Sequence, residues 1–263
     1  MYSNSLMLIE LVLFVFMTTK DRHISKRWYL LFAIVFLLIN GLIIYSESIF
    51  LVKWSRVVNS ILIIIYLIKW HKLYDHNRYL IGMILLILSD FCLVYFKNYW
   101  SNIFFFIFTA VGFATFLKDV IKFIQWKKIT ISSSLIVLLL FLFESYLIHN
   151  IIQLISPELE FWIILLFYVY GFTSLLYCLI ATLGYLQLEK ASTEHYLIIP
   201  YSFLISSAFY AIAMYSSNYV SYFYSRIFYI VCIFTLAHLI ATRLRFNTRI
   251  NNNVKDANSA NFN

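Results

Sequence analysis

Long apolar runs, each closed by a short polar or charged segment, follow one another along almost the whole chain. A helix needs about 20 mainly apolar residues to cross the hydrocarbon core of a bilayer. The run at 51–68 is the weakest, because its uninterrupted apolar core covers only Val57–Ile68. The pattern predicts an all-α polytopic bundle of eight or nine transmembrane helices. The runs lie at about 4–19, 28–46, 51–68, 79–96, 99–117, 130–149, 161–186, 196–216 and 219–242.

Composition agrees with this pattern and excludes a water-soluble fold. Hydrophobic residues make up 63% of the 263 positions, charged residues make up 12%, and the mean hydropathy is +0.84. Soluble domains are about 45–50% apolar and about 25% charged. No loop between the apolar runs exceeds about a dozen residues, so residues 1–250 are predicted to form one transmembrane domain. The polar segment 251–263 is predicted to be a disordered tail.

The formal net charge of +8 has a topological explanation. If the amino terminus lies outside, the outer side of the membrane receives only Lys53, Arg56, Lys97 and Arg226, and the other sixteen of the 20 Lys and Arg fall inside. Because cytoplasmic loops carry the excess of cations, we expect a bacterial plasma-membrane protein with its amino terminus outside and its carboxy terminus in the cytoplasm. The inner cations then face anionic lipid, and nucleic acid is not an expected partner.

A weak internal duplication relates the two halves of the chain. Ser89-Asp90 closes an apolar stretch that precedes a short polar link and an aromatic-rich span, and Ser206-Ser207 repeats this arrangement later. The predicted repeats, at about 28–117 and 130–242, would be parallel, with a site between the halves. The alternative is that Leu- and Ile-rich helices resemble each other through composition alone.

Ionisable residues inside spans are the informative ones, because each costs about 2.5–3.5 kcal/mol at the centre of a membrane helix. Five such residues occur: Glu10, Asp90, Glu144, Arg226 and His238. We expect Asp90 to be held away from lipid, with a polar neighbour from the carboxy-terminal half. For each of the five, a purely structural role remains open.

Several chemistries have no support in the sequence. The chain has no G-x-S-x-G elbow, P-loop or dinucleotide fingerprint, the motifs that would indicate a serine nucleophile or a nucleotide. The three cysteines lie in apolar runs, and the paired His and carboxylate residues around His71 and His195 lie in charged loops. We therefore predict neither a metal nor a cofactor.

Short elements of the chain resemble the YhhN family of membrane proteins, which includes the lysoplasmalogenases. The resemblance covers about residues 30–245. Two family features are missing: Ser207 stands where a second acid is expected, and no histidine lies between Asp90 and Lys118. In addition, Phe234 replaces a tyrosine of the last helix. Trp54 stands where the family has a proline after the lysine. The similar elements are Lys53, Ser89-Asp90 before Phe91-Cys92-Leu93, Leu204–Ala208, Arg226, and Ala237-His238-Leu239-Ile240.

The resemblance implies hydrolysis of the vinyl-ether bond of a lysophospholipid within the membrane, giving a fatty aldehyde and a glycerophospho head group. Such a reaction needs a general acid and base, and a carboxyl in a low-dielectric bundle suits the acid role. Asp90 is the expected acid/base. Glu144 or His238 would replace the missing second acid, and Ser207 would orient water.

The predicted topology would place the head-group site for such a substrate at the outer side of the membrane. Lys53, Arg56 and Arg226 are expected to hold the phosphate, with Ser89 next to the catalytic carboxyl. Membrane lipids are therefore the expected partners, with a lysophospholipid as substrate. The sequence carries no signal for an oligomeric state.

Two other function classes remain open. A non-catalytic lipid-binding or sensory membrane protein of the same fold would account for the missing acid and histidine. A small-solute or proton-coupled transporter would use Asp90 and His238 to relay protons or to bind a solute.

Overall fold

A computed structural model gives the fold as a bundle of α-helices without strands in the residues that it describes. Those residues are 26–46, 48–71, 73, 77–95, 98–122, 124–158, 160–188, 194–216 and 219–260. The helices are α2 (Lys26–Tyr45), α3 (Ile49–His71), α4 (Asn77–Val94), α5 (Tyr99–Ile121), α6 (Ile131–Ile155), α7 (Phe161–Leu188), α8 (Glu194–Ser216) and α9 (Tyr219–Ala260). Single 3-10 turns, η2 (Trp126–Lys128) and η3 (Ser156–Glu158), flank α6.

Seven of the described helices are long and apolar enough to cross a membrane, which confirms the predicted polytopic α-bundle. The span that looked weakest is complete, since Ile49–Lys69 forms one apolar stretch of 21 residues. In α2 the apolar helix is shorter, Leu31–Tyr45. The predicted first span, 4–19, with its Glu10, lies outside the described residues.

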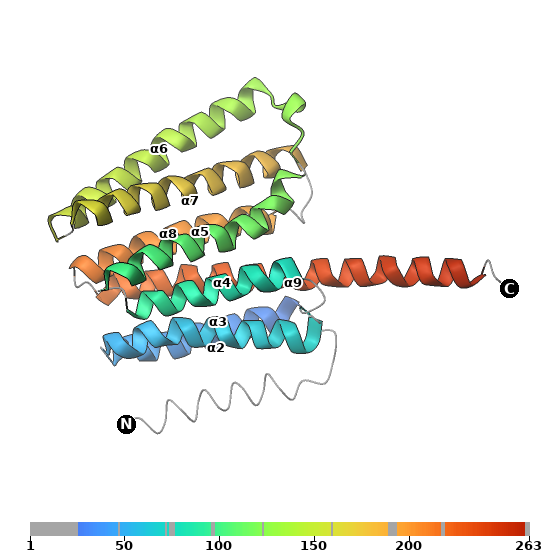
Figure 1. Cartoon of the computed structure of the whole chain (residues 1–263), viewed down its shortest axis with the longest axis horizontal. Coiled ribbons are helices and arrows are strands. Elements are labelled where there is room, and N and C mark those ends of the chain that lie inside the picture. The colour runs from blue at the N-terminus through green and yellow to red at the C-terminus, as the bar shows by residue number, and fades with distance from the viewer. Residues whose placement is uncertain are drawn as a thin grey trace.

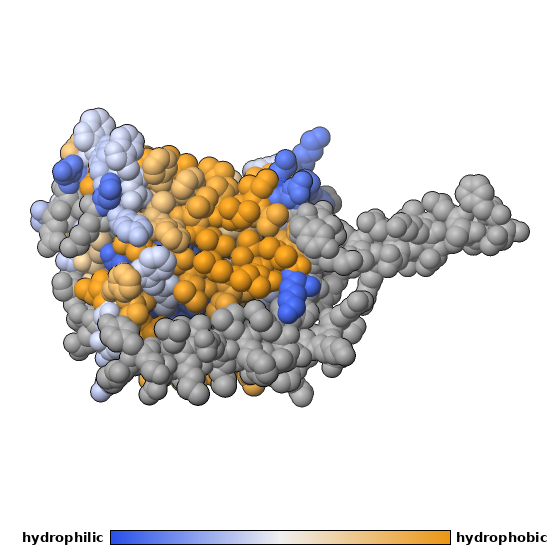
Figure 2. Space-filling view, turned by 60° about the horizontal axis from the view of Figure 1, so that its bottom comes forward, coloured by the Kyte–Doolittle hydropathy of each residue, from blue (hydrophilic) through white to orange (hydrophobic). Residues whose placement is uncertain are grey.

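The surface of the bundle has the layering expected of a membrane protein. Figure 2 shows a continuous apolar band in the middle of one face, with polar residues toward the two ends. At the end that holds the α2–α3, α4–α5 and α6–α7 loops, exposed aromatic residues include Tyr45, Tyr95, Trp100 and Trp162. Tyrosine and tryptophan favour the membrane–water interface, so this end marks one edge of the hydrocarbon layer. We call it the aromatic end.

Helix α9 is central to the packing. It contacts α8, α2 and α3, whereas α6 lies at the edge of the bundle and packs mainly on α7 and α8 (Figure 1). Two further contacts, α4 with α5 and α5 with α7, connect the layers. Because α9 lies beside α2 and α3, residues from the carboxy-terminal half reach the interior of the amino-terminal half.

Glycine allows the closest helix approach, between α4 and α5. A Cβ atom on Gly82 would lie 2.8 Å from the Phe116 ring, and one on Gly112 would lie 3.4 Å from the Gly82 carbonyl oxygen. Small residues that let helix backbones approach are the usual basis of packing in membranes. This contact fixes α4, the helix that carries Asp90, against α5.

The helical contacts are compatible with the predicted four-helix repeat. If α2–α5 corresponds to α6–α9, then α3 corresponds to α7 and α5 corresponds to α9. The contact of α3 with α9 then has its counterpart in the contact of α7 with α5, and both contacts are present. The halves also meet where α2 contacts α9, and the corresponding contact of α6 with α5 is not among the main contacts of the described helices, so the two halves do not meet symmetrically.

The carboxy-terminal segment differs from its prediction. Helix α9 continues through the polar residues to Ala260 and projects beyond the other helices (Figure 1). Residues 251–260, predicted as part of a disordered tail, are thus helical, and 261–263 lie outside the described residues. The physical reason is that extending an existing helix costs much less than starting one. The polar composition of this segment gives no sign that it continues a helix that begins inside the membrane.

Candidate functional site

Asp90 lies inside the bundle and is held by groups from two other helices. It is 3% exposed, near the end of α4. The Arg56 Nε donates to its Oδ1 at 2.5 Å. The hydroxyls of Ser60 and Tyr229 both bond to its Oδ2, the tyrosine at 2.5 Å. Asp90 is therefore kept from lipid, as expected, and Tyr229 on α9 supplies the expected neighbour from the carboxy-terminal half.

The spacing of residues along α3 brings two of these partners together. Arg56 and Ser60 are four residues apart, so they lie on the same face of the helix. The guanidinium of Arg56 also lies over the Tyr229 ring, with 4.1 Å between Cζ and the ring centroid. Such a cation–π contact favours the cation in a desolvated site. Arg56 is thus a buried member of the Asp90 cluster within α3, not a cation of the outer loop.

Arg226 adds a second guanidinium close to the cluster. It is 1% exposed, and its Nη2 donates to the Val52 carbonyl oxygen. Its Nη1 and the buried hydroxyl of Tyr210 have no hydrogen-bond partner among the described residues. Arg226 interacts electrostatically with Arg56, Asp90, Tyr210 and Tyr229. Two guanidiniums around one carboxylate leave the cluster with excess positive charge and two unused donors.

A small cavity of about 20 Å³ borders the carboxyl and is lined by Arg56, Ser89, Asp90 and Tyr229 together with apolar side chains. A buried water needs roughly 10–15 Å³ and polar neighbours. The cavity can therefore hold one water molecule. As it stands, it has no space for a lipid chain.

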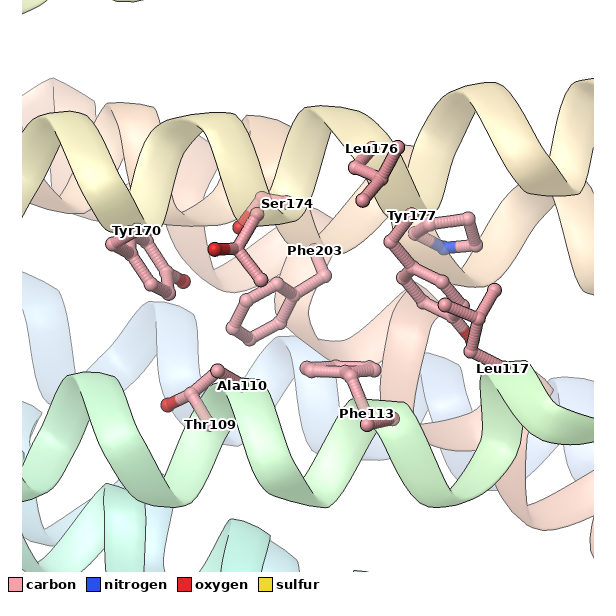
Figure 3. A pocket seen from close by; sticks show the side chains of 12 residues that line it. Thr109, Ala110, Phe113, Leu117, Tyr170, Ser174, Leu176, Tyr177 and Phe203 are labelled. Atoms are coloured by element: carbon pink, nitrogen blue, oxygen red, sulfur yellow. The ribbon is translucent and has the colours of Figure 1, made fainter.

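A second, larger hollow lies between α5, α7 and α8, as Figure 3 shows. Its volume is about 80 Å³, and its lining is mainly aromatic and aliphatic. Phe113 and Phe203 line both this groove and the Asp90 cavity. Their ring centroids are 4.3 Å apart. The two rings thus form a shared wall between the groove and the carboxyl.

Glu144 does not join Asp90. It is buried in α6, and neither carboxyl oxygen has a hydrogen-bond partner among the described residues. The Tyr201 hydroxyl interacts with the carboxyl, but its hydrogen bond, of 3.0 Å, links it to Thr182. Glu144 therefore belongs to a separate polar group between α6, α7 and α8.

Other predicted residues are also spread over the bundle. The His238 ring packs on His195, with centroids 5.0 Å apart, and lies about 18 Å along α9 from Arg226 at 1.5 Å per residue. Lys53 donates to the Val94 carbonyl oxygen at 3.5 Å. Of the eight predicted residues, the structure brings Asp90, Arg56 and Arg226 together, and Ser89 borders their cavity.

The serine pairs used to predict the repeat make matching bonds in the two halves. Ser89 bonds to Thr109 on α5 at 2.6 Å, and Ser206 bonds to Ser225 on α9. The residue after each serine bonds to the second helix of its half: Asp90 to Arg56, and Ser207 to Tyr170 at 3.1 Å. Ser207 thus occupies an uncharged counterpart of the Asp90 position. The duplication itself stays a prediction.

Three members of the cluster escaped the sequence analysis: Ser60, Tyr210 and Tyr229. A signal did exist for two of them, because Ser60 follows Arg56 by four residues and Tyr229 follows Arg226 by three, so each pair shares a helix face. The abundance of tyrosine in the chain masked this pattern. Tyr210 has no comparable signal.

Comparison with known proteins adds no relative, since no family model, curated protein or solved structure matches the chain.

Proposed function

We propose that this integral membrane protein is a lysophospholipid vinyl-ether hydrolase of the YhhN type, with Asp90 as its acid/base. The observation that carries the proposal is the buried Asp90 carboxyl, which receives Arg56 on one oxygen and the Ser60 and Tyr229 hydroxyls on the other. Ionisable groups are expensive inside a membrane bundle and usually serve a functional site. This one lies where the two halves of the chain meet.

Vinyl-ether hydrolysis requires a proton to be delivered and a water to be added. The proton goes to the enol-ether carbon that is not bonded to oxygen, and water then attacks the oxygen-bearing carbon of the resulting oxocarbenium ion. The water loses one proton, and the hemiacetal breaks into a fatty aldehyde and an alcohol, which takes up a proton. General acid/base groups within hydrogen-bonding reach accelerate such transfers.

The Asp90 cluster offers the groups for these transfers. The carboxylate accepts the proton of the attacking water, and the cavity of about 20 Å³ beside it has space for that water. The Tyr229 hydroxyl, which bonds to Oδ2, donates the proton to the enol-ether carbon, and the proton that the carboxylate takes from the water returns to the tyrosine oxygen. Ser60, whose hydroxyl lies 2.5 Å from that of Tyr229, is a second exchangeable group in this path. Arg56 holds the carboxyl in position through Oδ1.

The unused donors next to the cluster suit a phosphate-bearing substrate. Arg226 Nη1 and the Tyr210 hydroxyl are buried without an acceptor, and an unmade hydrogen bond of a buried group costs about 1–3 kcal/mol. A phosphate oxygen would satisfy both donors and offset the excess positive charge. Arg226 and Tyr210 are therefore the proposed head-group contacts.

The test is aldehyde release from a 1-alkenyl lysophospholipid by the purified protein in lipid nanodiscs. Wild type should release aldehyde in proportion to enzyme. Tyr229→Phe, which removes one hydroxyl from Asp90, should lower kcat by about 10²-fold or more if the hydroxyl takes part in proton transfer. Asp90→Asn should abolish turnover.

The matched control is Tyr201→Phe, which removes a hydroxyl of the same kind from the separate Glu144 group. It should keep wild-type turnover. Unchanged turnover in folded Asp90→Asn would remove Asp90 from the mechanism, and an inactive wild type would refute the hydrolase proposal.

A lipid-binding protein without turnover is the second candidate, favoured by one specific observation. Both oxygens of Asp90 are already bonded to protein groups, an arrangement that also suits a purely structural ion pair. This candidate predicts saturable lysophospholipid binding by wild type with no aldehyde release.

A further inference from the structure

The groove between α5, α7 and α8 has properties that the proposed reaction does not itself explain. It opens past exposed residues such as Leu176 on α7 and Ala114 on α5, and its floor is formed by the Phe113–Phe203 pair. In a membrane, that opening faces acyl chains. Few polar groups line it, among them Thr109 and Ser174 (Figure 3). The lining therefore suits hydrocarbon.

The groove and the Asp90 cavity are neighbouring spaces that share two aromatic side chains. Phe113 and Phe203 belong to the lining of both spaces. Phenylalanine rings can change rotamer without breaking any backbone hydrogen bond, and the two rings lie between the groove and the cavity. The wall is thus the simplest route by which a chain in the groove can bring its polar end to Asp90.

The order of these groups along the helices supports a lipid bound in one direction. On α9, Tyr229 lies three residues farther from the aromatic end than Arg226, about 5 Å at 1.5 Å per residue. On α8, Phe203 lies seven residues farther from that end than Tyr210, about 10 Å. On each of the two helices, the unused donor therefore lies nearer the aromatic end than the residue that borders the Asp90 cavity, Tyr229 or Phe203. A lysoplasmalogen has the order phosphate, vinyl ether and hydrocarbon chain.

We propose that this groove binds the hydrocarbon chain of a single-chain phospholipid, and that the Phe113–Phe203 pair moves to admit its head-group end to Asp90. The direction of the bound lipid rests on the proposed function. The occupancy of the groove does not, because it depends on the lining and the opening alone. The occupant is a single chain because a hollow of about 80 Å³ has no room for a second chain beside the first.

The experiment uses a lysophospholipid with a saturated 1-O-alkyl chain and a diazirine near the chain end, in nanodiscs that contain the full-length protein. This probe has no vinyl ether, so its binding is measured without turnover. Light should label peptides from α5 and α7 around Ala114 and Leu176, and excess unlabelled lysophospholipid should reduce that labelling at least tenfold.

Tryptophan substitutions test whether the groove itself is the site. Ala114→Trp, which fills the groove, should reduce labelling at least tenfold. Val111→Trp on the same helix should label like wild type, since Val111 is exposed but outside the lining. If Ala114→Trp does not fold, the same contrast is available on α7 between Leu176→Trp in the groove and Leu165→Trp outside it.

Two results would overturn the proposal: labelling of the groove between α2 and α3, which is lined by Phe36, Asn40 and Trp54 and holds about 150 Å³, or wild-type labelling of a folded groove-filling variant. The outcome is separable from that of the hydrolase proposal. Labelling in the groove without aldehyde release refutes the reaction and keeps the groove, whereas aldehyde release with labelling elsewhere does the reverse.

Discussion

Replacing Asp90 with asparagine should destabilise the protein strongly, because the change removes the charge that compensates Arg56 and Arg226 while keeping the shape of the side chain. Asp90 and Arg56 are 3% and 1% exposed. An exposed ion pair would contribute about 0–1 kcal/mol. Breaking a buried pair by removing one partner costs about 3–5 kcal/mol, because an uncompensated charge stays inside. We expect Asp90→Asn to fall in that range.

The companion variants separate charge from packing. Arg56→Met alone leaves Asp90 with its two hydroxyl partners and should also be destabilising. The double variant Arg56→Met/Asp90→Asn should lose less than the sum of the two single losses, with a coupling of about 2–3 kcal/mol, as expected for residues in direct contact. Adding Arg226→Met to Asp90→Asn should recover stability, because it removes a second unpaired cation.

The assay is unfolding by SDS titration in mixed micelles, followed by intrinsic fluorescence, with the midpoint and slope measured for each variant. Equal slopes allow the midpoints to be compared as free energies. A loss below about 1 kcal/mol for Asp90→Asn would mean that the pair behaves as exposed. Strict additivity of the two single changes would mean that the Arg56–Asp90 contact is absent in the membrane-embedded protein.

Three further predictions concern other parts of the molecule. Gly82→Ala should destabilise the α4–α5 contact by about 1–3 kcal/mol, because the new Cβ would overlap the Thr115 hydroxyl and lie 2.8 Å from the Phe116 ring. Gly41→Ala, whose new Cβ would have its nearest neighbour at 3.9 Å, should be tolerated in the same unfolding assay. Glu144→Met should raise the free energy of unfolding by about 1–3 kcal/mol, because it removes a buried carboxyl whose oxygens have no hydrogen-bond partner among the described residues. It should leave aldehyde release unchanged. Lower stability or lost turnover would mean that Glu144 contributes to the fold or to the reaction. A reporter fused after Ala260 should be active only in the cytoplasm, and a periplasmic signal would reverse the predicted orientation.

The helices were predictable because the bilayer imposes one simple requirement, a long apolar stretch per crossing. The predicted run 99–117 became Tyr99–Ile121, and 161–186 became Phe161–Leu188. The end of α9 was missed because helix propagation into a polar segment leaves no hydropathy signal. The orientation of the termini stays a prediction, since the bundle itself carries no information about which side is the cytoplasm.

Only those residues of the site could be predicted that have a high free-energy cost inside a membrane span. Asp90 and Arg226 were recognised because a charge within a span needs a reason, and both lie in the cluster. Glu144 met the same criterion yet lies elsewhere, because sequence spacing does not say which face of which helix meets which neighbour. Tyr229 and Ser60 were missed because a hydroxyl in a span costs little and therefore gives little signal.

The position of α9 has a consequence for biogenesis. Chains insert in order of synthesis, and earlier segments fold first, so Arg56 on α3 and Asp90 on α4 enter the membrane long before Tyr229 and Arg226 arrive on α9. Until then the ion pair lacks its aromatic cover and part of its hydrogen bonding. The nascent protein therefore passes through a stage with a polar pair open to lipid, the kind of exposed feature by which membrane chaperones and proteases distinguish unfinished chains from finished ones.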